Sequence, residues 1–145
     1  MLTKVKLSIL LLLVFTAAVA QTPIDGLQKN NLAYLESLES EGYSFRSQII
    51  TEFDREHATQ NVNIKLSEDY TYLIVGIGDI NILSLTLAIK PSQKAKMKLL
   101  DLPSGFTGQS SQVNPSRSGS FKIDITAADF KEDENGFISF MVLRK

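Results

Sequence analysis

Apolar and polar residues alternate with a period of two along most of this chain, from residue 43 to the C-terminus. The clearest runs are residues 62–66, 83–89 and 121–125, and turn-forming residues separate them. Alternation of this kind puts one side of each segment against a core, which is typical of half-buried β-strands. Helical periodicity does not recur between these segments, so the pattern argues against a parallel β-helix-β architecture and favours antiparallel sheets.

Three segments carry more specific predictions. Residues 70–77 are β-branched and aromatic, which predicts a central strand buried on both faces. Residues 94–99 alternate Lys with apolar side chains, which predicts a strand whose solvated lysine face also discourages edge pairing. Residues 102–118 are rich in Ser, Gly and Pro, so we expect mostly loop there, with one brief strand near residues 109–114.

Two local patterns predict how the strands begin and turn. Tyr43, Phe45, Ile49 and Phe53 have the same parity, so we expect them on one face of a strand. The pair Asn135-Gly136 predicts a type I′ hairpin turn before the last strand. Together the segments predict a mainly β domain at residues 43–145, an antiparallel, jelly-roll-like sandwich of seven or eight strands.

One short amphipathic helix is expected before the strands, within residues 21–42. Pro23 stands near its start and Gly42 where a C-terminal cap belongs. Its apolar positions recur at helical spacing and are Ile24, Leu27, Leu32, Leu35 and Leu38.

Residues 1–20 have the pattern of a secretory signal peptide. Lys4 and Lys6 precede an apolar run at residues 7–17, and the small residues 18–20 end it. Cleavage after Ala20 predicts an exported protein, periplasmic or extracellular, and no later segment is apolar enough to span a membrane. The chain has no Cys, so export would proceed without disulfides or a thiol-linked lipid, which suits a bacterial envelope.

Length and charge limit the classes of function. The 145 residues suffice for one compact domain, and 43% of them are hydrophobic. The formal net charge is -1 for the whole chain, with 15 basic and 16 acidic residues. Removing the two lysines of the leader leaves 13 basic residues and a net charge of -3. A nucleic-acid-binding domain normally carries a basic excess, so nucleic acid is not an expected partner.

The sequence assigns no catalytic residue. A nucleophile needs a base, and the only imidazole is His57, in a polar segment. There is no Gly-x-Ser-x-Gly elbow, phosphate loop, zinc spacing or dinucleotide fingerprint. A small secreted hydrolase that uses His57 or a pair of carboxylates remains an alternative.

Polar loops supply the candidate binding residues. The segment 129–136 is acidic and matches part of a calcium loop at residues 133–136. Lys131 and Val142 occupy the positions where an EF-hand needs carboxylates, so no metal site is assigned and no cofactor is expected. A calcium-stabilised structural module remains a second alternative. The candidate binding residues are Asp79, Asn81, Asp101, Asp129 and Asp133.

From about residue 61 onward, the order of features resembles the bacterial pre-peptidase C-terminal domain, a small jelly-roll module of secreted peptidases and other exported proteins. The segments that carry the likeness are residues 66 and 72–79 (YLIVGIGD), 83–87 (LSLTL), 115–123 (PSRSGSFKI) and 136–140 (GFISF). Members of that family commonly carry Asp where this chain has Ser84 and Thr86, and an Asp-x-x-Gly turn where it has residues 90–93. The resemblance therefore implies a fold and an exported setting, and no activity.

The leading expectation is an exported, non-catalytic β-sandwich that binds a polysaccharide or a protein of the envelope or the extracellular medium. The loops at residues 102–118 and 129–136 are long enough to build a recognition surface.

Overall fold

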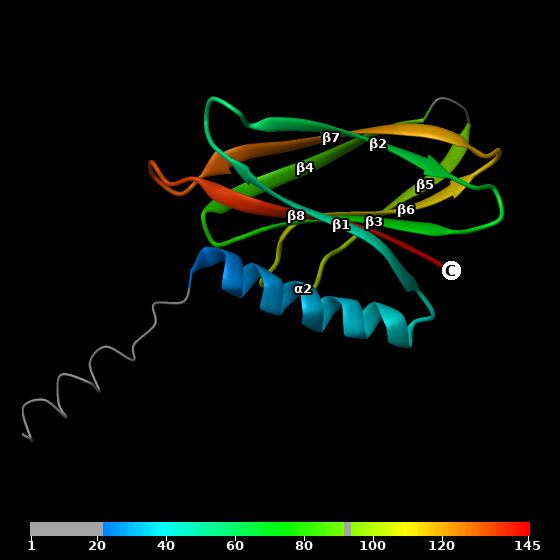
Figure 1. Cartoon of the computed structure of the whole chain (residues 1–145), viewed down its shortest axis with the longest axis horizontal. Coiled ribbons are helices and arrows are strands. Elements are labelled where there is room, and N and C mark those ends of the chain that lie inside the picture. Colours follow the sequence, from blue (N-terminus) through cyan, green and yellow to red (C-terminus); the bar gives the residue numbers. More distant parts are fainter. Residues whose placement is uncertain (1–21, 92–93) are drawn as a thin grey trace, which may run out of the picture.

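The computed structural model describes residues 22–91 and 94–145; the predicted signal peptide lies outside them. One helix precedes eight strands (Figure 1). Their bounds are α2 (Pro23–Ser40), β1 (Ser44–Phe53), β2 (Thr59–Leu66), β3 (Tyr72–Gly78), β4 (Ile82–Pro91), β5 (Ala95–Leu100), β6 (Thr107–Pro115), β7 (Gly119–Phe130) and β8 (Gly136–Arg144). No helix in this part of the chain is long and apolar enough to cross a membrane.

The strands form two antiparallel sheets, which confirms the predicted sandwich. The five-stranded sheet has the order β1-β8-β3-β6-β5, and the three-stranded sheet has the order β2-β7-β4. The pairs β1–β8, β2–β7 and β3–β6 are those of a long hairpin rolled into two sheets, which is jelly-roll topology. The fourth pair of such a hairpin, β4 with β5, is not formed, because β5 pairs with β6 instead.

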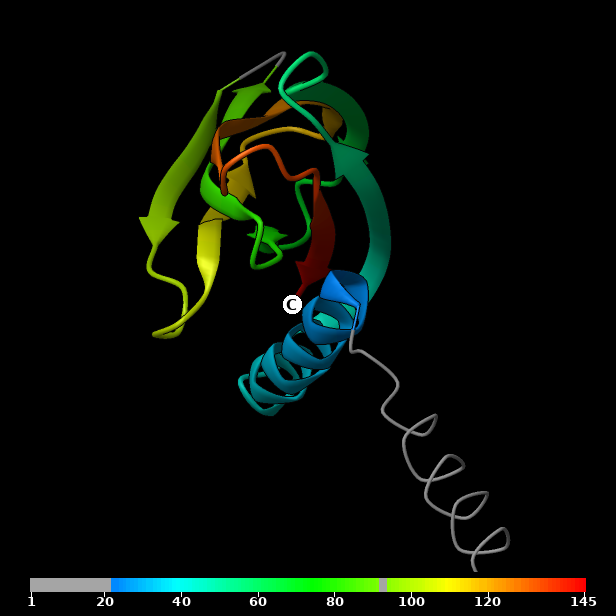
Figure 2. The same ribbon diagram turned by 90° about the vertical axis from the view of Figure 1, so that its left-hand side faces the viewer.

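The molecule has three layers, because α2 lies against the outer face of the five-stranded sheet (Figures 1 and 2). One apolar core fills the space between the sheets, and a second lies between the sheet and α2. The middle strand β3 belongs to both cores and all seven of its residues are buried, as the sequence predicts. Burial on both faces explains its near-continuous apolar sequence.

Local sequence signals fix both ends of α2. The backbone N–H of Thr22 donates to the carboxylate of Asp25 at 3.2 Å, at the start of the helix. At its end Gly42 adopts φ +93°, and the N–H groups of Gly42 and Tyr43 donate to the carbonyls of Glu39 and Leu38. This is a Schellman motif, and it turns Tyr43 back toward the second core.

The buried face of α2 differs in one position from the predicted stripe. Leu27 and Leu38 are buried as expected, whereas Leu32 is 60% exposed. Asn31 and Tyr34 lie on the buried face with them. The four residues that α2 buries against the sheet are therefore four, three and four positions apart, and one of them, Asn31, has a polar amide side chain.

The prediction that Phe45 and Ile49 share one face of β1 is wrong. The register of β1 against β8 shifts between Phe45 and Ser47, as a β-bulge does. Phe45 lies opposite Leu143, whose side chain belongs to the helix-side core, whereas Ile49 lies opposite Phe140 of the core between the sheets. One inserted residue thus reverses the parity on which the prediction rested.

The predicted type I′ hairpin at Asn135-Gly136 is also wrong. The strands β7 and β8 belong to different sheets, so the segment between them crosses the sandwich. The residue with positive φ is Glu132 at +45°, and the N–H of Glu134 donates to the carbonyl of Lys131. Gly136 begins β8, where an added Cβ would lie 2.4 Å from Ile82 Cδ1, so the glycine is needed for space.

The segment at residues 102–118 is more ordered than the sequence predicts. The expected brief strand is β6, which extends over nine residues and lies between β3 and β5. The cause is pairing on both sides: β3 and β5 supply partners that local turn residues do not reveal. The loop therefore shrinks to residues 101–106 and 116–118.

Candidate functional site

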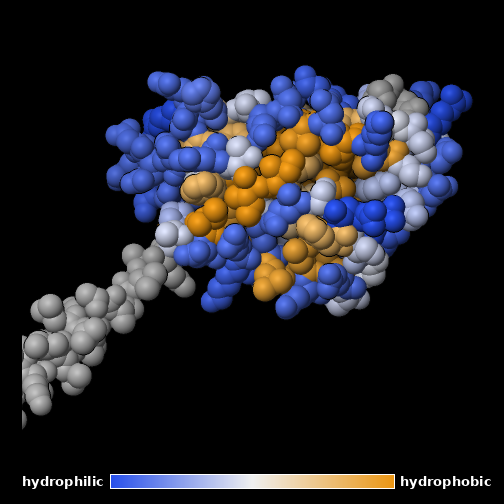
Figure 3. Space-filling view, viewed as in Figure 1, coloured by the Kyte–Doolittle hydropathy of each residue, from blue (hydrophilic) through white to orange (hydrophobic). Residues whose placement is uncertain are grey.

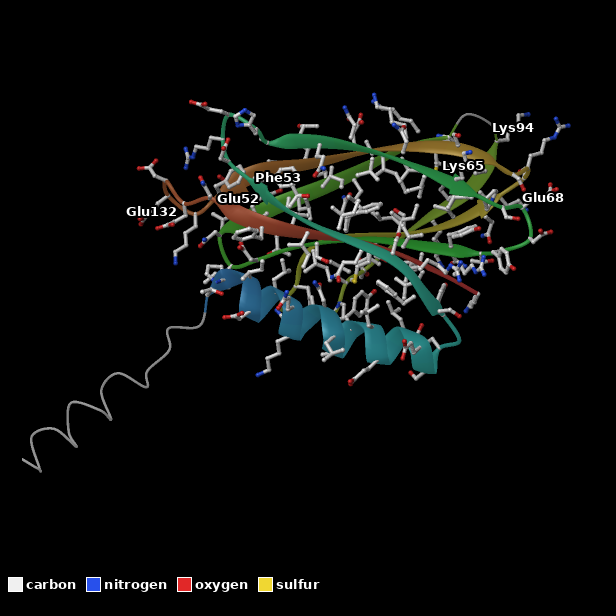
Figure 4. The ribbon with its side chains drawn as sticks, viewed as in Figure 1. Glu52, Phe53, Lys65, Glu68, Lys94 and Glu132 are labelled. Carbon is white, nitrogen blue, oxygen red and sulfur yellow. The ribbon has the colours of Figure 1, made fainter. Side chains whose placement is uncertain are left out.

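Four of the five predicted binding residues lie at one end of the sandwich, where β3 meets β4 and β7 meets β8. Glu52 and Glu132 mark this end in Figure 4. Asp79 and Asn81 form the β3–β4 turn, and Asp129 and Asp133 lie at the end of β7 and in the loop after it. The fifth residue, Asp101, follows β5 and lies beside α2.

Asp79 and Asn81 join two turns of the backbone. Asp79 is 5% exposed, and its carboxylate accepts the N–H of Asn81 at 2.9 Å and the N–H of Phe137 at 2.8 Å. The amide of Asn81 donates to the carbonyl of Asn135 at 2.8 Å. Both side chains therefore bind the protein's own backbone, the capping role that polar turn residues commonly have. Asp79 also lines a pocket of about 210 Å³ beside the N-terminal part of α2.

The other acidic side chains of this end do not converge. One oxygen of Asp129 accepts the N–H of Phe130 at 2.9 Å, and Asp133 is exposed. No group of three or more His, Cys, Asp or Glu side chains in residues 22–91 and 94–145 is arranged to hold a metal ion.

His57 lies in the loop between β1 and β2, with its side chain 79% exposed. Its Nδ1 is 3.1 Å from Oδ1 of Asp54 and 3.2 Å from Oδ2. The backbone N–H of His57, and then its ring, stabilise the Asp54 carboxylate and lower its pKa below the ordinary value. The loop is also tied to the β7–β8 segment, because Arg55 donates to the carbonyl of Glu132.

Asp101 lies on a pocket between α2 and the five-stranded sheet, which we call the helix–sheet pocket. It is a half-open surface hollow with a volume of about 400 Å³. Most of its walls are apolar or aromatic, and two carboxylates and a hydroxyl accompany them. The lining residues are Tyr34, Ser37, Leu38, Glu41, Tyr43, Leu73, Leu100, Asp101, Leu102 and Pro103.

Each wall of the helix–sheet pocket comes from a different part of the chain. Tyr34 and Leu38 lie one helical turn apart on the buried face of α2, and the Schellman motif positions Tyr43 next to them. Leu73 of β3 and Leu100 of β5 line the pocket from the sheet. The loop at residues 101–106 closes the other side, held by Phe106, whose ring centroid is 5.9 Å from that of Tyr34.

The polar groups of the pocket are two carboxylates, two phenols and the hydroxyl of Ser37. Burial raises the pKa of Tyr34, an interaction with Ser110 offsets part of the rise, and the charge of Glu41 adds to it. Glu41 and Asp101 are exposed at the rim. The pocket therefore combines an apolar interior with two carboxylates at its rim, which suits an apolar group next to a positive charge. One cation is already close by, since Nζ of Lys145 lies 4.5 Å from the centroid of the Tyr43 ring.

An apolar band crosses the middle of the face seen in Figure 3, where β1 runs between α2 and the three-stranded sheet. The exposed apolar residues of β1 and α2 are Phe45 and Ile49, each 42% exposed, and Leu32. None of these three residues lines the helix–sheet pocket. The band offers apolar area without converging polar groups, so the pocket is the better candidate for specific recognition.

No family model, no curated protein and no solved structure matches this chain.

Proposed function

We propose that this chain is an exported, non-catalytic binding module that holds an apolar side chain of a protein partner in the helix–sheet pocket. The observation that carries the proposal is Asp101: the sequence singles it out, and it lies at the rim of an apolar pocket of about 400 Å³. The pattern of residues 1–20 supports export.

A protein partner fits the pocket better than a polysaccharide. Sugar-binding sites commonly offer an open aromatic face for stacking, and Tyr34 and Tyr43 are only 8% and 7% exposed. Five aliphatic or proline side chains line the pocket, a suitable environment for a partner's aliphatic or aromatic residue. Glu41 and Asp101 at the rim favour Lys or Arg next to that residue.

The environment of His57 supports a non-catalytic role. Its ring bonds to Asp54 within one exposed loop, and neither residue lines the helix–sheet pocket. A hydrolase would need a nucleophile or an activated water next to this imidazole. Loss of a hydrolytic activity in His57→Ala would overturn the non-catalytic proposal.

The test is binding of the purified protein to peptides that carry Leu or Phe flanked by Arg, with the same peptides flanked by Glu as controls. We expect preference for the Arg-flanked set and at least a tenfold loss of affinity in Leu102→Asp. The matched control is Leu32→Asp, which adds the same charge to α2 outside the pocket and leaves affinity unchanged.

Two charge-reversal variants test whether the carboxylate of Asp101 contributes to binding. Asp101→Lys weakens binding of the Arg-flanked peptides, whereas Asp133→Lys, in the acidic loop, does not. Thermal melts with calcium, with chelator and with envelope polysaccharides cover the alternatives, since a ligand at a hundred times its dissociation constant adds about 2.7 kcal/mol of stability. The proposal would be refuted if calcium or one glycan raised the melting temperature and Leu102→Asp left the affinity for the peptides unchanged.

A further inference from the structure

β5 is an edge strand of the five-stranded sheet, and its four middle residues are exposed on both faces. It pairs with β6 on one side only, and Figure 2 shows it at the margin of the molecule with no described element beyond it. Met97 and Leu99, on the face toward the other sheet, are 47% and 64% exposed. Lys96 and Lys98 are exposed on the opposite face.

The charge of this edge is uncompensated. Lys94, Lys96 and Lys98 form no ion pair with any residue in 22–91 and 94–145. Their neighbours across the strand pair are neutral as well, since Lys96 lies opposite Asn114 and Lys98 opposite Gln112. Three cations at alternate positions, with exposed apolar residues between them, give the edge two chemically distinct faces.

On the same side of the molecule, a side chain covers part of the backbone edge of the three-stranded sheet. β4 is the terminal strand there, and the N–H of Leu87 donates to Oε1 of Gln109 at 2.7 Å. A side chain thus takes the position of a neighbouring strand's carbonyl. No side chain in the described part of the chain bonds to the free backbone edge of β5 in this way, so β5 is the more open of the two edges.

We propose that β5 accepts an extended acidic segment of a partner protein as a sixth strand of the five-stranded sheet. Backbone hydrogen bonds to a free edge supply affinity in such β-augmentation, and alternate side chains supply specificity. Acidic residues of the incoming strand would lie beside Lys96 and Lys98, and apolar residues beside Met97 and Leu99. Cross-strand pairs of opposite charge stabilise an antiparallel pair.

A second copy of this chain does not fit the same edge. Two β5 strands would bring lysines together, and like charges across a strand pair are destabilising. The remaining edge strands are β1, β2 and β4, and among their residues only Glu52 is acidic. Lysines on an edge are known to deter self-pairing, and this agrees with an acidic partner of different sequence.

The probe is a synthetic peptide of alternating Glu and Val, and its control alternates Lys and Val. We expect the acidic peptide to bind the protein, to bind more weakly as salt rises, and to protect amides of residues 95–100 from hydrogen exchange. In the double variant Lys96→Glu, Lys98→Glu its affinity falls about tenfold and that of the lysine peptide rises. Lys65→Glu, on β2, is the matched control and changes neither affinity.

Three results would overturn the proposal: no binding of the acidic peptide at millimolar concentration, equal losses in Lys65→Glu and the double variant, or binding without protection of β5. Leu100 of β5 also lines the helix–sheet pocket, so the two sites adjoin and are told apart by their peptides: charge reversal at Lys96 and Lys98 weakens binding of the acidic peptide, whereas Leu102→Asp weakens binding of the Arg-flanked peptides. Failure at the pocket and failure at β5 are therefore distinguishable.

Discussion

Replacing Asn31 by Leu is expected to stabilise the protein. Asn31 is 2% exposed on the buried face of α2, and neither Oδ1 nor Nδ2 has a hydrogen-bond partner among the described residues. A buried polar group left without a partner costs about 1–3 kcal/mol, and an apolar group of similar shape removes that cost. Since the neighbours on this face include Leu27 and Leu38, a leucine there also extends the apolar contact with the sheet.

The magnitude can be separated from helix propensity with a matched control. Leu favours a helix interior over Asn by a few tenths of a kcal/mol, roughly 0.5, wherever it stands on the helix. Asn30→Leu makes the same chemical change at the adjacent, exposed position, so it reports propensity alone. We expect the free energy of unfolding to rise by about 1–3 kcal/mol more in Asn31→Leu than in Asn30→Leu.

Urea unfolding followed by circular dichroism measures the difference. A domain of this size has an m-value of about 1–3 kcal/mol/M, so the midpoint should move upward by about 1 M with m unchanged. A midpoint equal to or below that of Asn30→Leu would refute the reasoning, because it would mean that the amide has its hydrogen bonds in the native state, for example to an internal water. The outcome matters for function, since α2 carries Tyr34 and Leu38 of the helix–sheet pocket.

Two further predictions concern charged groups. Asp79→Ala removes the acceptor of the backbone N–H groups of Asn81 and Phe137 and should lower the free energy of unfolding, measured in urea, by about 2–4 kcal/mol. The control Asp133→Ala should change it by less than about 0.5 kcal/mol. The Lys90 side chain bonds to Asp124 and lowers the pKa of its carboxyl below the ordinary value, so Lys90→Met should raise that pKa in an NMR titration. A lowered pKa stabilises the fold at pH above the unfolded-state pKa, and this contribution is lost as pH falls through the folded pKa. The variant should therefore show a smaller loss of stability on acidification, and an unchanged titration of Asp124 would contradict the pairing.

Much of the fold is predictable because local chemistry and tertiary structure agree over most elements. Gly42 predicts the end of the helix, the apolar run of β3 predicts a strand buried on both faces, and the structure confirms both. The bulge in β1 has no such signal, because it depends on how β8 pairs with residues 45–47. Asn135-Gly136 fails for a related reason: a turn dipeptide does not say whether the next strand joins the same sheet or the opposite one.

The candidate sites are less predictable than the fold because distant segments build them. Asp101 is detectable as a loop carboxylate, but the pocket next to it is built by α2, β3, the end of β5 and the loop after β5. Tyr34 and Tyr43 give only the signal of buried aromatic residues, which a core without a pocket would also give. The polar side chain that sequence reasoning favours most in the β3–β4 turn, Asp79, bonds to the protein's own backbone.

The two proposed surfaces have a common origin in the position of β5. In a fully formed jelly roll β5 would continue the three-stranded sheet beside β4, and the loop after it would lie on that side of the sandwich. Here β5 pairs with β6, so the loop at residues 101–106 reaches α2 and forms a wall of the helix–sheet pocket. The same displacement leaves Met97 and Leu99 without a facing strand and leaves the lysines along a free edge. One change of strand partner therefore creates both a pocket and a lysine-rich edge whose apolar residues face no strand, and this is why we place recognition at β5 and its following loop.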